Sequence, residues 1–162
     1  LLSRRQRQMC IETVKGLGAG EYSVLVYNQP WVKEQQQTTN GWSLNLSQDF
    51  GEKLSLFARI NGVSGNIADF KNSYVIGGVY NNPLDRNPLD QIGLAAAYNK
   101  INKKAAGTDT KHDYETVLEA YWAWGISKWM TLTPDIQFYI NPALNTKSDY
   151  ASVYTLRATV FF

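Results

Sequence analysis

Few residue types in this chain could carry out covalent or metal chemistry. The one histidine, His112, stands in a polar stretch, and no Gly-x-Ser-x-Gly motif accompanies it. The one cysteine, Cys10, lacks neighbours that would activate a thiolate, and a single cysteine excludes an internal disulfide and a multi-cysteine zinc site. The glycine run at 16–20 precedes a predicted strand, so it does not match a dinucleotide-binding loop. We therefore predict that the protein is not an enzyme and that it has no catalytic residue, metal or cofactor.

Other polar side chains recur at every second position between apolar ones. Charged examples in the middle of such segments are Arg59, Glu119, Asp135 and Arg157. Arginine offers several fixed hydrogen-bond donors and carboxylates offer acceptors, so these groups suit reversible contacts with polar molecules or with water. Successive side chains of a strand point to opposite faces, so strands would gather these groups on one face of a sheet.

Alternation is clearest in the last eleven residues, 152–162, where one parity is wholly apolar and the other is mostly polar. The segment 130–141 repeats the pattern, and Pro134 predicts a bulge or an unpaired position there. The segment 115–127 also fits helical spacing at Leu118, Trp122 and Ile126, but its tryptophans and the strands around it favour a strand.

Eight or nine strands are predicted, over the segments 9–14, 21–28, 41–49, 54–61, 73–80, 91–99, 115–127, 130–141 and 152–162. Residues 1–8 are predicted to be a loop or tail. Short connections at 15–20, 50–53 and 128–129 alternate with long ones at 29–40, 62–72, 100–114 and 142–151, and 81–90 is intermediate. Such alternation is typical of transmembrane β-barrels.

The composition supports a membrane barrel over a nucleic-acid-binding or helical membrane protein. The 162 residues carry 16 basic and 14 acidic side chains, a net charge of +2, which is too balanced for a nucleic-acid partner. No apolar run approaches the ~18 residues of a membrane helix, whereas several strands are near the ~9–11 residues of a membrane strand. Trp42, Tyr98, Trp129 and Tyr154 are expected near strand ends, where aromatic girdles lie. We predict an all-β, antiparallel transmembrane β-barrel integral to the bacterial outer membrane.

Specific segments then resemble the carbohydrate-selective porin family typified by OprB. They are DYETVLE (113–119), SKWMTLTPDIQFYINP (127–142), LRAT (156–159), GWSLNLSQDFGEKLSLFARI (41–60) and PLDQIGLAAAY (88–98). The likeness covers most of 21–162. It implies a barrel of about sixteen strands, of which residues 1–162 would form the C-terminal half. The start at Leu1 without a methionine agrees with a fragment.

The resemblance implies an outer-membrane channel for passive diffusion of carbohydrates and other small polar solutes. The candidate substrate-binding residues of its water-filled interior are Arg59, Glu115, Glu119, Tyr121, Asp135, Gln137, Tyr139 and Arg157. The same groups could instead form salt bridges that brace the wall, and both roles stay open. Phe162, Val160 and Tyr154 would form the terminal signal that the outer-membrane assembly machinery reads. Lipid and lipopolysaccharide, the solutes, and further copies in a homotrimer are the expected partners, and nucleic acid is not.

Two other interpretations remain open at the level of the sequence. One is a complete small barrel of eight strands that acts as a structural anchor or adhesin, because such barrels are filled by side chains and conduct little. The other is an outer-membrane enzyme or a soluble β-domain that binds a ligand, which would require a Ser/His site or a sheet that packs against other protein.

Overall fold

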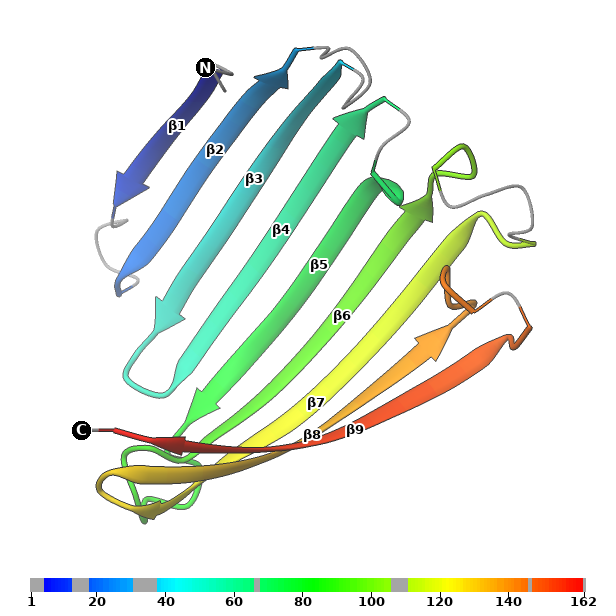
Figure 1. The fold of residues 1–162 in the computed structure, drawn as a ribbon. Coiled ribbons are helices and arrows are strands. Elements are labelled where there is room, and N and C mark those ends of the chain that lie inside the picture. The colour runs from blue at the N-terminus through cyan, green and yellow to red at the C-terminus, as the bar shows by residue number, and fades with distance from the viewer. Residues whose placement is uncertain are drawn as a thin grey trace.

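The computed structural model describes residues 18–30, 38–65, 68–105, 111–145 and 147–161 fully, and the backbone alone of 5–12. Nine strands form one antiparallel sheet in which each strand pairs with its neighbours along the chain. The strands are β1 (Arg5–Glu12), β2 (Gly20–Gln29), β3 (Thr39–Phe50), β4 (Leu54–Ser64), β5 (Phe70–Asn81), β6 (Gln91–Ile101), β7 (Tyr114–Ser127), β8 (Met130–Ile140) and β9 (Tyr150–Val160). Figure 1 shows an open, curled sheet with β1 and β9 at its edges.

All nine predicted strands are confirmed, and 115–127 is a strand rather than a helix. The predicted loop or tail over 1–8 is wrong for residues 5–8, because β1 already begins at Arg5 and pairs with β2. A closed small barrel of eight strands is also wrong, because the sheet has nine strands and its edges do not pair. The connection predicted as long over 62–72 is short, because β4 continues to Ser64 and β5 starts at Phe70.

Pro134 lies at a position that is unpaired on the side of β7, as the sequence predicted. Tyr121 pairs with Asp135 and Trp124 pairs with Leu132, and the β7–β8 ladder is interrupted between these two pairs. Pro134 falls in this gap and pairs only with Leu156 of β9. A proline has no N–H to donate to a second neighbouring strand, and the gap in the β7–β8 ladder means that no such donor is required at Pro134.

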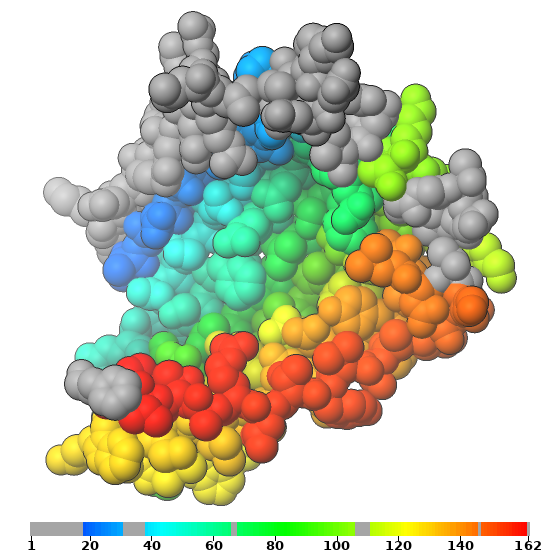
Figure 2. Space-filling view, viewed as in Figure 1, coloured from blue at the N-terminus to red at the C-terminus, as the bar shows by residue number. Residues whose placement is uncertain are grey.

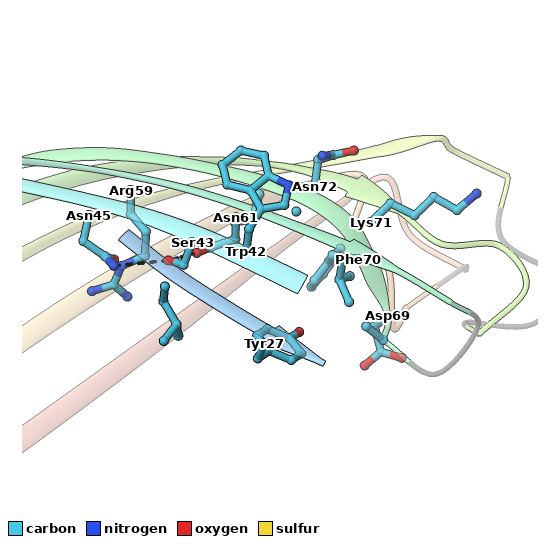
Figure 3. A pocket seen from close by; sticks show the side chains of 15 residues that line it. Tyr27, Trp42, Ser43, Asn45, Arg59, Asn61, Asp69, Phe70, Lys71 and Asn72 are labelled. Carbon is cyan, nitrogen blue, oxygen red and sulfur yellow. Dashed lines mark hydrogen bonds between the residues drawn. The ribbon is translucent and has the colours of Figure 1, made fainter. Parts of the chain in front are cut away.

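The strand register divides the side chains into two faces. What we call the polar face carries rows such as Ser43, Asn61, Ser73, Asn99 and Glu115, which lie opposite one another on β3 to β7. The apolar face carries Leu46, Ala58, Ile76, Ala96, Leu118 and Phe138 in a parallel row. The sheet curls towards the polar face, since Arg59 and Asn45 lie inside the curve while Trp42 lies outside it (Figure 3).

The described residues form a single-layer sheet, and none of them packs against its apolar face. Only two hydrophobic residues, Ile101 and Ala143, are buried among the fully described residues. Ile76 is 65% exposed, Leu94 61% and Leu156 68%, all in the middle of strands. Figure 2 shows the resulting trough, with the orange and red surface of β8 and β9 standing in front of the cyan and green wall of β3 to β5. No helix of the described residues is long and apolar enough to cross a membrane.

Aromatic residues gather at both ends of the apolar face. At the end of the long loops these are Trp42, Tyr74, Tyr98, Tyr114 and Tyr150, and at the end of the short turns they are Phe50, Tyr80, Trp122, Trp124 and Trp129. The rings of Tyr98 and Tyr114 stack with their centroids 4.9 Å apart. The expected positions of Trp42, Tyr98 and Trp129 near strand ends are confirmed. Tyr154 is an exception, because it pairs with Ile136 in the middle of β9.

Aromatic side chains also cover glycines of the adjacent strand. Four directly paired couples do this, Tyr27 with Gly41, Trp42 with Gly62, Phe57 with Gly77 and Tyr121 with Gly93. In each couple a Cβ on the glycine would overlap the aromatic ring. The ring therefore lies against the backbone of the neighbouring strand, an arrangement that compensates for the missing glycine side chain.

Candidate functional site

The polar face brings together all eight residues that the sequence proposed for solute contact. The ladders place Arg59 on β4, three residues on β7, three on β8 and Arg157 on β9, always with the parity of the polar face. None of the four salt bridges formed by the described residues involves any of the eight. The alternative in which these groups brace the wall as ion pairs therefore has no support among the described residues.

Most of these residues form a cluster on β7, β8 and β9. Glu119 lies opposite Gln137, and Tyr121 lies opposite Asp135. The Tyr139 hydroxyl donates a hydrogen bond of 2.8 Å to Gln137 Oε1. Arg157 lies on the adjacent strand β9, where it pairs with Thr133, two residues from Asp135. The cluster thus offers two kinds of acceptor, carboxylate oxygens and an amide oxygen, beside the donors of one guanidinium group.

Asp135 has an acceptor that the protein leaves unused. Its Oδ1 atom is buried and has no hydrogen-bond partner among the described residues. An unpaired buried acceptor is costly, and because this atom has no exposed surface a passing molecule does not reach it. The groups that can exchange hydrogen bonds with a polar molecule at the polar face are the partly exposed side chains of Glu119, Gln137 and Tyr139 and the exposed Arg157.

Arg59 belongs to a second group, on β3 and β4. A hollow of about 490 Å³ lies there, and its lining includes Arg59, Tyr27, Asn45 and Asn61. Ser43 Oγ donates to Asn61 Oδ1 at 2.6 Å, and Asn45 Nδ2 donates to Ser43 Oγ at 3.2 Å. Figure 3 shows Arg59 beside this hydrogen-bonded group on the inside of the curve. The guanidinium is exposed, so its donors face the hollow.

Glu115 differs from the other seven because it is buried, at 6% exposure. Its Oε1 atom accepts a hydrogen bond of 3.2 Å from Asn99 Nδ2, and its Oε2 atom accepts one of 2.8 Å from the backbone N–H of Ala143. Both carboxylate oxygens are thus engaged with the protein. The structure places Glu115 within the wall, where it joins β7 to the loop between β8 and β9.

Sequence reasoning missed several polar-face residues. Tyr27 and Phe57 lie over glycines on this face, as Tyr121 does. The face of Tyr27 could not be assigned without the register, because its segment lacks clear alternation, whereas Phe57 shares the parity of Ser55 and Arg59 but was not proposed as a candidate because it is apolar. The signal that identifies them is the paired glycine on the next strand, which only the ladder reveals.

The remaining candidates of the sequence are not gathered into a reactive site. His112 Nε2 lies 3.2 Å from Asp149 Oδ1 and joins two loops, while the side chain of Cys10 lies outside the described residues. In the part of the chain that the structure describes, no group of three His, Cys, Asp or Glu residues could hold a metal ion. Of the proposed assembly signal, Tyr154 and Val160 are exposed on β9, and Phe162 lies outside the described residues.

Comparisons with known proteins agree with this geometry. The model of the carbohydrate-selective porin, OprB family, matches residues 15–162. Porin AaxA of Chlamydia abortus is 44% identical over 142 residues, which are 88% of this chain and 32% of the relative. Porin AaxA of Chlamydia pneumoniae is 45% identical over 144 residues, which are 88% of this chain and 33% of the relative.

A solved structure of Pseudomonas putida OprB, determined at high pH, has the same fold. It superposes with a TM-score of 0.75 at 20% identity, and the match covers 96% of this chain and 47% of that one. The chain therefore spans about a third of the curated relatives and about half of the solved structure. The open sheet, its unpaired edges and these matches show that the chain is part of an outer-membrane β-barrel and belongs to the carbohydrate-selective porin family, OprB.

Proposed function

We propose that the complete protein is a channel through which carbohydrates and other small polar solutes diffuse passively across the bacterial outer membrane. Porins are channels rather than enzymes, and membership of the family supports this coarse function. The apolar face would meet lipid, and closure of the barrel would pair every backbone group that the open edges leave free. The polar face would then line a water-filled pore.

The observation that carries the carbohydrate assignment is the mixture of groups on the polar face. Tyr27, Phe57 and Tyr121 place aromatic rings against the wall over paired glycines. Sugar rings have apolar C–H faces and hydroxyl edges, so they suit a surface of aromatic rings and hydrogen-bonding groups together. The donors of Arg59 and Arg157 and the acceptors of Glu119, Asp135 and Gln137 supply the hydrogen-bonding part.

The experiment is single-channel recording of the complete gene product in planar bilayers, with increasing concentrations of a neutral sugar. We expect discrete conductance steps and a sugar-dependent reduction of the current. Tyr121→Ala and Phe57→Ala should weaken this block, because each removes a ring from the pore wall. Leu118→Ala, on the apolar face, is the matched control and should leave the block unchanged.

Two outcomes would count against the proposal. Bilayers that show no conductance steps with a folded protein would exclude a channel. Conductance without any block by sugars, equal in the wild type and in Tyr121→Ala, would leave a general channel for small polar solutes and remove the carbohydrate preference.

The orientation and partners belong to the same proposal. We place the short turns in the periplasm and the long loops outside, as in bacterial outer-membrane barrels. The exposed apolar face of β9, which includes Tyr154 and Val160, suits recognition of an edge strand by the assembly machinery. Contact with lipid and lipopolysaccharide around the barrel, and association into a homotrimer, remain predictions.

A further inference from the structure

The loop between β8 and β9 folds back over the polar face instead of extending from the sheet. Asn141 has a left-handed backbone with φ of 55°, and its N–H still donates to Asp149 O at 2.8 Å, so the ladder closes beneath the loop. Beyond it, Asn145 N donates to Pro142 O at 3.2 Å and makes a compact turn. Figure 1 shows this orange loop turning back towards β7.

Glu115 is the residue that holds the loop there. Its side chain is on the polar face of β7, and its Oε2 atom accepts the Ala143 N–H at 2.8 Å. Ala143 is only 3% exposed. The other carboxylate oxygen accepts from Asn99, which in turn accepts from Ser73 Oγ at 2.7 Å. A row of hydrogen bonds thus runs from β5 across β6 and β7 to the loop.

The next residue of the loop has the opposite environment. Leu144 is 86% exposed, the highest value among the exposed large hydrophobic residues. Leu144 therefore does not pack on the wall beside Ala143, and at this end of the polar face of a porin the surrounding space is the water-filled mouth of the pore. A single exposed apolar side chain is common on protein surfaces, so the position of the anchored loop carries the inference.

We infer that the described part of the β8–β9 loop, residues 141–145 and 147–149, is a constriction at the mouth of the pore on the long-loop side, and that Glu115 is its positioning residue. The inference rests on the proposed channel function and adds a specific site to it. The loop reduces the open cross-section because Glu115 holds it against the inner wall, and Leu144 is the side chain that permeating solutes pass. A solute with an apolar face, such as a sugar ring, would contact Leu144 there.

The first test is the single-channel conductance of Glu115→Ala and Glu115→Gln in the complete gene product. In Glu115→Ala the loop loses its anchor, so we expect a larger mean conductance and more current noise. Glu115→Gln keeps one acceptor oxygen, so its conductance should lie between those of the wild type and Glu115→Ala. Glu52→Ala is the matched control, because Glu52 is exposed in the short turn between β3 and β4. Its conductance should equal that of the wild type.

The second test does not depend on the fold of the Glu115 variants. In a cysteine-free background, Leu144→Cys is labelled from the long-loop side with a charged methanethiosulfonate reagent during recording. We expect a stepwise loss of conductance that a reducing agent reverses. Leu118→Cys on the apolar face is the control and should show no change.

Failure of the inference and failure of the proposed function give different results. If the wild type conducts but labelled Leu144→Cys and Glu115→Ala both conduct like it, the loop is not a constriction and the channel assignment stands. If the folded wild type does not conduct at all, the proposed function is wrong, and the inference falls with it.

Discussion

Among the described residues, each end of the sheet holds one buried carboxylate, and the two carboxylates are held by different partners. At the short-turn end, Asp90 is fully buried, accepts the Gly125 N–H at 2.7 Å and receives Arg86 Nη2 at 2.8 and 3.0 Å. At the long-loop end, Glu115 accepts only an amide side chain and one backbone N–H. No arginine or lysine forms a salt bridge with Glu115 among the described residues.

The environment of Asp90 explains why its end is fixed. The pairing of β6 with β7 ends at Ala123, yet β7 continues to Ser127. Asp90 accepts the Gly125 N–H, and Asn87 Nδ2 donates to the Gly125 and Ser127 carbonyls at 3.1 and 3.3 Å. Side chains of the turn thus replace the missing strand neighbour, and buried backbone groups find partners. Arg86 adds a contact 5.2 Å above the Trp124 ring.

The difference separates a structural cap from a contact that can be released. Loss of Asp90 would leave a backbone N–H without a partner in a buried position, whereas a loop released from Glu115 would let Ala143 bond to water. We therefore expect mutations at the short-turn end to affect stability most, and mutations at the long-loop end to affect permeation most.

The largest effect on stability is expected for Asp90→Ala. This change removes a buried, charge-assisted set of hydrogen bonds, so it should reduce the free energy of unfolding by about 3 kcal/mol. The measurement is urea unfolding of the complete protein in lipid vesicles, followed by tryptophan fluorescence. Lys53→Ala, which removes the other partner of the exposed Lys53–Asp85 salt bridge, is the control and should change the unfolding free energy far less. Equal effects of the two variants would contradict the view of Asp90 as a cap.

A smaller loss is expected for Glu115→Ala in the same assay. Because the freed loop can hydrogen-bond to water, the free energy of unfolding should fall by about 1 kcal/mol. Conductance should change in this variant and not in Asp90→Ala molecules that remain folded. If Glu115→Ala destabilised the protein as strongly as Asp90→Ala, the distinction between a structural cap at one end and a releasable contact at the other would be wrong.

The smallest effects concern the exposed ion pairs at the two ends. Hydrogen bonding to Lys103 lowers the pKa of Asp113 from its ordinary value of 3.8, so this pair stabilises the fold above that pH and loses its contribution as the pH falls through the lowered pKa. Hydrogen bonding to Asp85 raises the pKa of Lys53 from 10.5, so that contribution is present below this pH and disappears as the pH rises through the raised pKa. Both pairs are solvent-exposed, so the changes are small.

Their signs can be checked by unfolding the wild type, Asp113→Asn and Lys53→Gln at a series of pH values. The difference between wild type and Asp113→Asn should vanish only in acid, and that between wild type and Lys53→Gln only in strong base. A difference that disappears at the opposite extreme would show that the assigned partners are wrong.

Much of the fold was predictable because strand alternation is a local property. The two parities of 152–162 and 130–141 follow from which residues are apolar, and they remain correct whatever the strands pair with. The same argument placed all eight candidate residues on one face of the sheet. The start of β1 was not predictable, since residues 5–8 are polar or charged and become a strand by pairing with β2.

The role of single residues within that face was much less predictable. Glu115 and Glu119 have the same type and parity and are only two repeats of the alternation apart, yet Glu115 is buried under the β8–β9 loop and Glu119 is not. The difference comes from Ala143, which lies far along the chain. The aromatic rings over glycines have the same origin, because a Tyr–Gly couple exists only once the register of two strands is set.

Alone, the order of residues determined a lipid-facing side, a polar side and the ends of most strands, because the energy of each side chain in water or hydrocarbon depends on its own chemistry. The tertiary structure decided which carboxylates are free and which are bound, because a hydrogen bond needs two groups at the right distance. For Asp90 and Glu115 those second groups are supplied by segments remote in the chain.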